Sequence, residues 1–133
     1  MRKIEHLGIA VKDIHAANKL YTTLLNTEPY KQELVESEGV ITSFFMCGDS
    51  KIELLQATGS ESPIAKFIEK RGEGIHHIAF DVDDIEKEIR RLQKEGFQLI
   101  HQTPKDGADN KLIAFLHPKS SNGVLVELCQ EKL

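Results

Sequence analysis

Hydrophobic and polar positions alternate with a period of two in two separate stretches of this 133-residue chain, residues 4–11 and residues 75–82. This period is typical of a strand with two different faces. One face carries Leu7, Ile9 and Val11 in the first stretch, and Ile78, Phe80 and Val82 in the second. The other face carries His6, Gly8 and Ala10, and His77, Ala79 and Asp81. We therefore predict two strands that each pair a bulky face with a face holding a histidine among small residues.

Helical spacing follows each of these strands. Asp13 and Asp84 are suited to cap helices that begin at Ile14 and Ile85, where apolar residues recur every three or four positions. A third helix is predicted over about residues 62–72, because Ser62 is a good capping residue and Pro63 suits the first helical position. The pattern thus predicts one helix after each opening strand and one between the halves.

Further strands are predicted from short apolar runs bounded by turn residues. In the first half they cover residues 30–35, 40–47 and 51–56, and in the second half residues 97–101, 111–117 and 124–129, with a loop over residues 103–110. Each half then has the element order βαβββ. The sequence predicts an α+β protein of two tandem βαβββ modules.

The two halves also share chemistry-bearing residues at a near-constant offset. His6 and His77 are 71 residues apart, and Glu53 and Glu127 are 74 apart, each glutamate lying between aliphatic residues near the end of its half. Agreement of period and element order indicates an internal repeat. We predict a single domain, residues 1–133, with module one at 1–57, a connecting helix at about 62–72 and module two at 74–133.

Composition narrows the class of protein. Hydrophobic residues make up 40% and charged residues 29%, as in ordinary globular proteins. A net charge of −4 argues against nucleic acid or an anionic membrane as a partner, and no apolar run approaches the ~20 residues that span a bilayer. The chain opens on a strand-like segment rather than a signal peptide, and Cys47 and Cys129 form no close pair. We expect a cytoplasmic protein with reduced thiols.

The repeated polar residues suggest a metal site. By strand alternation, His6, Glu53, His77 and Glu127 all lie on the faces opposite the bulky aliphatic residues. A buried carboxylate is costly unless it is paired, and a metal ion is a natural partner. Two imidazoles with two carboxylates suit one divalent ion such as Co, Ni, Zn, Mn or Fe. Two modules that merely share a core would explain the repeated aliphatic positions. They would not explain why a histidine and a glutamate are each repeated in both halves.

The whole chain resembles the vicinal oxygen chelate superfamily, which includes glyoxalases and bleomycin resistance proteins, and within it most resembles the methylmalonyl-CoA epimerases. The most specific resembling motifs are His117-Pro118-Lys119 and the Gly-Val-Leu-Val-Glu run at residues 123–127. The other resembling segments are residues 6–11, 52–55, 62–65 and 74–80.

The resemblance implies a partly open mixed β-barrel around a metal, with the helices outside. Its ligands would be His6, Glu53, His77 and Glu127. The implied reaction interconverts (R)- and (S)-methylmalonyl-CoA by removing and returning the α-proton through a metal-stabilised enolate. The resemblance supports Glu127 as the principal acid/base, and the two-fold repeat offers Glu53 as its partner on the other side. The resemblance also implies an acyl-CoA thioester substrate and a homodimer.

Several alternatives stay open. Some epimerases carry a further glutamate shortly after a turn glycine and valine, but residues 39–43 here contain no carboxylate, so the second base is not settled. Glyoxalase I could use the same ligands, and a non-catalytic small-molecule-binding protein could use the same fold. Lys105, Lys111 and Lys119 are candidates for coenzyme A phosphates, although solvated surface lysines are the simpler interpretation.

Overall fold

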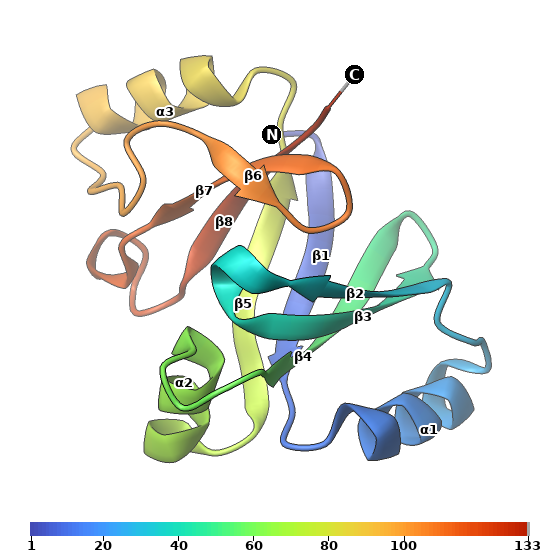
Figure 1. Ribbon diagram of the computed structural model, residues 1–133. Coiled ribbons are helices and arrows are strands. Elements are labelled where there is room, and N and C mark those ends of the chain that lie inside the picture. The colour runs from blue at the N-terminus through green and yellow to red at the C-terminus, as the bar shows by residue number, and fades with distance from the viewer. Residues whose placement is uncertain (133) are drawn as a thin grey trace. The chain divides into compact units, whose positions relative to one another are not determined.

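The computed structural model describes residues 1–132, which divide into two compact units, His6–His76 and Met1–Glu5 with residues 77–132. The elements follow the expected order twice over (Figure 1). The strands are β1 (Lys3–Ala10), β2 (Lys31–Val35), β3 (Val40–Cys47), β4 (Ser50–Ala57), β5 (Gly74–Asp81), β6 (Lys105–Gly107), β7 (Lys111–Leu116) and β8 (Val126–Glu131). The helices are α1 (Ile14–Leu25), α2 (Pro63–Arg71) and α3 (Ile85–Lys94), with short 3-10 turns at Glu36–Glu38 and Pro118–Ser120. The predicted α+β class with two βαβββ modules is confirmed.

The unit His6–His76 holds the strands in the order β2, β3, β4, β1. β4 is parallel to β1 and antiparallel to β3, while β2 is antiparallel to β3. Helix α1 packs against β3 and β4, and α2 packs against β4 (Figure 1). Its apolar core includes Val11, Ile14, Phe45 and Leu54, so the bulky faces of the strands lie against α1 as the alternation predicts.

The other unit holds the strands in the order β5, β8, β7, β6. β8 is parallel to β5 and antiparallel to β7, and β6 is antiparallel to β7. Helix α3 packs against β7 and β8 (Figure 1). Buried residues of this helix, Ile85, Ile89 and Leu92, form one core with Leu128 and its neighbours. The same strand pairing therefore builds both units, which is the structural meaning of the repeat.

Each repeated helix begins in the same way. The side chain of Asp13 accepts from the backbone of His15 and Ala16, and that of Asp84 accepts from the backbone of Lys87, as expected of capping residues. On the surface of α3, the guanidinium of Arg91 donates to Glu88 and lowers the pKa of that carboxyl.

One prediction in the second module is wrong. Residues 97–101 form no regular strand and make a single bridge, Leu99 with Leu116, whereas the short β6 lies inside the predicted loop 103–110. The reason is a contact with β7: the ring nitrogen Nδ1 of His101 accepts the hydrogen bond of the Phe115 backbone N–H. A regular strand would have supplied a backbone carbonyl as the acceptor. Gly107 of β6 lies tightly against Ile113: a Cβ there would be 2.7 Å from Cγ2 of Ile113, so a larger residue would require that side chain to shift.

Within the described residues, none of the helices combines the length and the apolar character that a membrane crossing requires.

Candidate functional site

The histidine of the first unit lies beside a glutamate. Nδ1 of His6, on β1, is 3.1 Å from Oε2 of Glu53, on β4. Both residues are buried, with exposed fractions of 3% and 5%. Neither side chain belongs to the cluster that packs against α1. The predicted polar face of this unit therefore carries a buried imidazole–carboxylate pair.

The second unit contains the equivalent pair. Nε2 of His77, on β5, is 2.9 Å from Oε1 of Glu127, on β8, and both residues are 5% exposed. The ring of Phe115 stands edge-on to the imidazole of His77, with the ring centroids 5.6 Å apart. The thiol of Cys129 donates a hydrogen bond to the other oxygen of Glu127, with Sγ 3.1 Å from Oε2.

Strand register explains why the two pairs are alike. Gly8 is the partner of Glu53 in the parallel pairing of β1 with β4, and Ala79 is the partner of Glu127 in the parallel pairing of β5 with β8. Each glutamate therefore has a glycine or an alanine beside it on the neighbouring strand. The small residues that the sequence pattern places on the faces of the histidines therefore lie beside the glutamates as well.

The donor atoms in each unit suit a divalent metal ion. An imidazole nitrogen and a carboxylate oxygen about 3 Å apart are common ligands of Zn, Co, Ni, Mn and Fe. A buried carboxylate needs a cation or strong hydrogen bonds to offset its lost hydration. The chemistry of the donors and their burial therefore fit the predicted cofactor, within each unit taken by itself.

The remaining histidines have other roles. His15 is exposed, and the ring of His76 stands edge-on to that of Phe67, with the ring centroids 5.0 Å apart. The imidazole of His101 accepts from Phe115, and that of His117 accepts from the backbone of Lys119 at the 3-10 turn Pro118–Ser120.

Two residues of the polar faces were missed from the sequence. Thr42 on β3 is fully buried, and its hydroxyl has no hydrogen-bond partner within residues 1–132. In the pairing of β3 with β4, Thr42 lies opposite Leu55 and Phe44 lies opposite Glu53. Thr42 is two positions from Phe44 on the same strand, so its side chain shares the face of Glu53. Cys129 is fully buried too. The two-residue alternation of the sequence could have identified Cys129, because it lies two positions after Glu127. Thr42 could be identified only from the pairing of β3 with β4.

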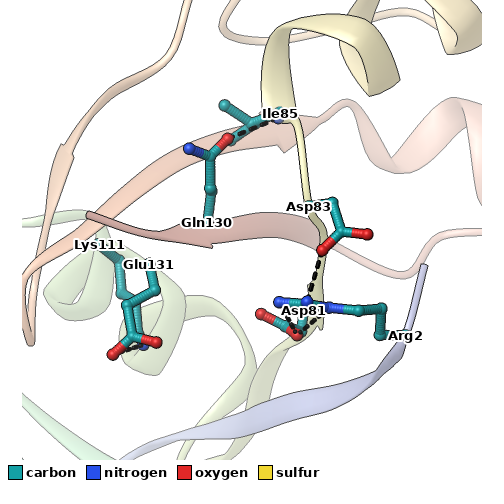
Figure 2. A network of polar contacts seen from close by, with 7 residues as sticks. All are labelled: Arg2, Asp81, Asp83, Ile85, Lys111, Gln130 and Glu131. Carbon is teal, nitrogen blue, oxygen red and sulfur yellow. Dashed lines mark hydrogen bonds and ion pairs between the residues drawn. The ribbon is translucent and has the colours of Figure 1, made fainter. Parts of the chain in front are cut away.

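Figure 2 shows a second set of polar contacts in the unit that contains His77 and Glu127. Arg2 binds Asp81, the last residue of β5, with Nη2 2.8 Å from Oδ2, and also pairs with Asp83. Lys111 is only 8% exposed and its Nζ lies 3.9 Å from Glu131. The interpretation of Lys111 as a solvated surface lysine is therefore wrong, whereas Lys119 is exposed.

Comparison with known proteins places the chain among proteins of one superfamily. The family model of the glyoxalase/bleomycin resistance protein/dioxygenase superfamily matches residues 5–115. An ethylmalonyl-CoA/methylmalonyl-CoA epimerase of Cereibacter sphaeroides is 42% identical over 130 residues, covering 96% of this chain and 97% of that protein.

Two solved structures extend the likeness to three dimensions. The methylmalonyl-CoA epimerase of Mycobacterium tuberculosis is 33% identical with a TM-score of 0.94, covering 98% of this chain and 88% of that one. A methylmalonyl-CoA epimerase in complex with methylmalonyl-CoA and NH4+ is 32% identical with a TM-score of 0.95, covering 98% and 95%. The fold class and the resemblance predicted from the sequence are confirmed: the chain belongs to the glyoxalase/bleomycin resistance protein/dioxygenase superfamily, in the family of the methylmalonyl-CoA epimerases.

Proposed function

We propose that this protein interconverts the (R) and (S) epimers of methylmalonyl-CoA. The α-carbon of this substrate lies between a thioester carbonyl and a carboxylate. Inverting it requires one group to remove a proton from one side and another to return a proton on the opposite side. The two buried imidazole–carboxylate pairs, repeated at equivalent positions of two modules, are the observation that supports a reaction with this two-sided chemistry.

We assign one divalent metal ion to His6, Glu53, His77 and Glu127 together. The fit rests on the donor types and on their burial in each unit. When bound, such an ion supplies Lewis-acid stabilisation of the negative charge that develops on the substrate oxygens as the proton leaves. The donor set suits Co, Ni, Zn, Mn or Fe.

The glutamates have the proton-transfer roles in this proposal. Glu127 removes or returns the α-proton on one side of the planar intermediate, and Glu53 serves the other side. Oε2 of Glu127 accepts a hydrogen bond from the thiol of Cys129, and Oε1 lies 2.9 Å from Nε2 of His77. Thr42 offers a further hydroxyl on the face of Glu53, although it cannot act as a base at neutral pH.

The proposal extends to the substrate, the compartment and the assembly of the protein. The substrate partner is an acyl-CoA thioester, the protein acts in the cytoplasm as a homodimer, and it binds neither nucleic acid nor membrane. The net charge of −4 supports the exclusion of nucleic acid.

A glyoxalase I activity is the competing enzymatic function, because the superfamily that matches the chain includes glyoxalases and similar ligands would serve it. The likeness to epimerases along almost the full length of both chains favours the epimerase. A protein that only sequesters a small molecule needs no acid/base residues, so the two buried glutamates speak against that class.

One experiment separates these functions. The Co²⁺-loaded protein is incubated in D₂O either with (S)-methylmalonyl-CoA or with the hemithioacetal of methylglyoxal and glutathione, and both reactions are followed by proton NMR. We expect loss of the α-proton signal and formation of the other epimer with the first substrate alone. Turnover of the hemithioacetal alone would replace the proposal by glyoxalase I. No reaction with either would favour the sequestering class.

A further inference from the structure

The two glutamates occupy equivalent positions but have different neighbours. Side chains two positions apart on a strand share a face. Two positions after Glu127 lies Cys129, and at the corresponding place after Glu53 lies Leu55, whose side chain has no hydrogen-bonding group. The repeat is therefore broken at one point beside the carboxylates.

The contact between Cys129 and Glu127 is well placed to orient the carboxylate of Glu127. The thiol donates to Oε2 at 3.1 Å while Oε1 lies 2.9 Å from Nε2 of His77, so the two oxygens have different partners. A carboxylate held at both oxygens cannot rotate about its last bond without losing one of these contacts. The orientation of Glu127 is thereby set by two residues of the same unit.

The surroundings make this weak donor effective. Cys129 is fully buried and packs with Ala79 and Ile113, and its sulfur lies within 4.8 Å of a carboxylate oxygen of Glu5, which is buried too. Ile113 is the partner of Cys129 in the pairing of β7 with β8. Burial excludes competing water and strengthens a hydrogen bond to a charged acceptor.

We infer that Cys129 is a positioning residue, whose thiol holds Oε2 of Glu127 and so presents Oε1 on the side of His77. This inference rests on the proposed function, in which Glu127 is a ligand and an acid/base. Residues that orient metal ligands typically change metal affinity or activity by about 10–100-fold when they are lost. Cys129 would then give Glu127 an orientation that Glu53 does not obtain from Leu55.

The first test observes the hydrogen bond itself and needs neither metal nor substrate. The S–H stretching band of Cys129 is isolated by infrared difference spectroscopy between the protein and C129A. The exposed Cys47 supplies the matched control through C47A. We expect the Cys129 band at lower frequency than the Cys47 band, with a return towards the Cys47 frequency in the E127L background. A Cys129 band that coincides with that of Cys47 in the unsubstituted protein would overturn the inference.

The second test measures the consequence for the site. Co²⁺ affinity by calorimetry and the visible spectrum of the Co²⁺ protein are compared for C129A, C129V and C129S. We expect about 10-fold weaker binding and an altered spectrum in C129A and C129V, and near-complete recovery in C129S, whose hydroxyl can donate to the same oxygen. Affinity and spectrum unchanged in both C129A and C129V would contradict a positioning role.

Two controls keep the outcomes distinct. Thermal unfolding of each variant separates loss of binding from loss of folding, and C129V retains the apolar packing if C129A proves unstable. E127L tests the proposed function: if it leaves Co²⁺ affinity unchanged, the ligand assignment fails and the inference with it. If E127L weakens binding while C129A and C129V do not, only the role of Cys129 is overturned.

Discussion

Gln130 on β8 accepts a hydrogen bond from the backbone N–H of Ile85, the first residue of α3, at 2.8 Å (Figure 2). Gln56 on β4 makes the same contact with Ile14, the first residue of α1, at 2.7 Å. The first N–H groups of a helix have no partner within the helix itself. In each unit a closing-strand glutamine therefore supplies that partner, three residues after the glutamate of the imidazole–carboxylate pair.

This contact predicts the effect of removing either glutamine. Q130L and Q56L leave a helix N–H without its partner, and we expect each to lower the free energy of unfolding by about 1–2 kcal/mol. Urea denaturation followed by circular dichroism measures the change. The exposed Gln93 on α3 provides the control variant Q93L, which should change stability much less. Equal effects of Q130L and Q93L would argue against the capping role.

The two-base proposal predicts a specific isotope pattern. E127Q and E53Q each retain an oxygen that can bind metal but lose one base. We expect each variant to exchange the α-proton of only one epimer with D₂O, and neither variant to interconvert the epimers. Proton NMR of the separate (R) and (S) substrates measures this. Exchange of both epimers by E127Q at the unsubstituted rate would remove Glu127 from the catalytic role.

The proposed roles of His6 and His77 as ligands predict how their loss changes metal binding. H6A and H77A remove proposed ligands, and we expect each to weaken Co²⁺ binding at least about 100-fold, more than the loss of an orienting residue. The exposed His15 and the packing His76 supply the controls H15A and H76A, which should bind normally. Calorimetry with the metal-free protein gives all four affinities. Normal binding by H6A or H77A would exclude that histidine from the site.

Thr42 predicts a gain of stability. Its buried hydroxyl has no partner within residues 1–132, and such a group costs free energy in the folded state. T42V keeps the side-chain shape without the hydroxyl, so we expect the free energy of unfolding to rise by about 1 kcal/mol. The neighbouring Ser43 donates its hydroxyl to Gln32, and S43A should therefore lower stability. A loss of stability in T42V would indicate that the hydroxyl is hydrogen-bonded in solution.

The pair on α3 predicts a dependence on pH. Arg91 lowers the pKa of Glu88 below its ordinary value of 4.5, chiefly through the side-chain hydrogen bond. A lowered pKa in the folded state contributes stability above the ordinary pKa, which is lost as the pH falls through the lowered value. The stability difference between the protein and R91A should therefore be present at neutral pH and vanish in acid. NMR titration of Glu88 should show its pKa rising in R91A.

The period of two in the sequence is enough to separate the faces of the strands. Ile9 and Val11 pack with the residues of α1 while His6 does not, because successive side chains of a strand point to opposite faces regardless of the fold. The capping roles of Asp13 and Asp84 are equally local, since the side chain binds the turn that directly follows it.

The tertiary structure decided the contacts between residues far apart in the chain. Residues 97–101 have a strand-like composition, yet the ring nitrogen of His101 accepts the hydrogen bond from Phe115 and interrupts the pairing. The distances that bring His6 to Glu53 and His77 to Glu127 depend on the parallel register of β1 with β4 and of β5 with β8. The sequence by itself determined which side chains could share a face, because alternation is a property of each strand. Only the folded chain determined which of them touch, because register depends on the turns and on which faces are buried when strands far apart in the chain pair.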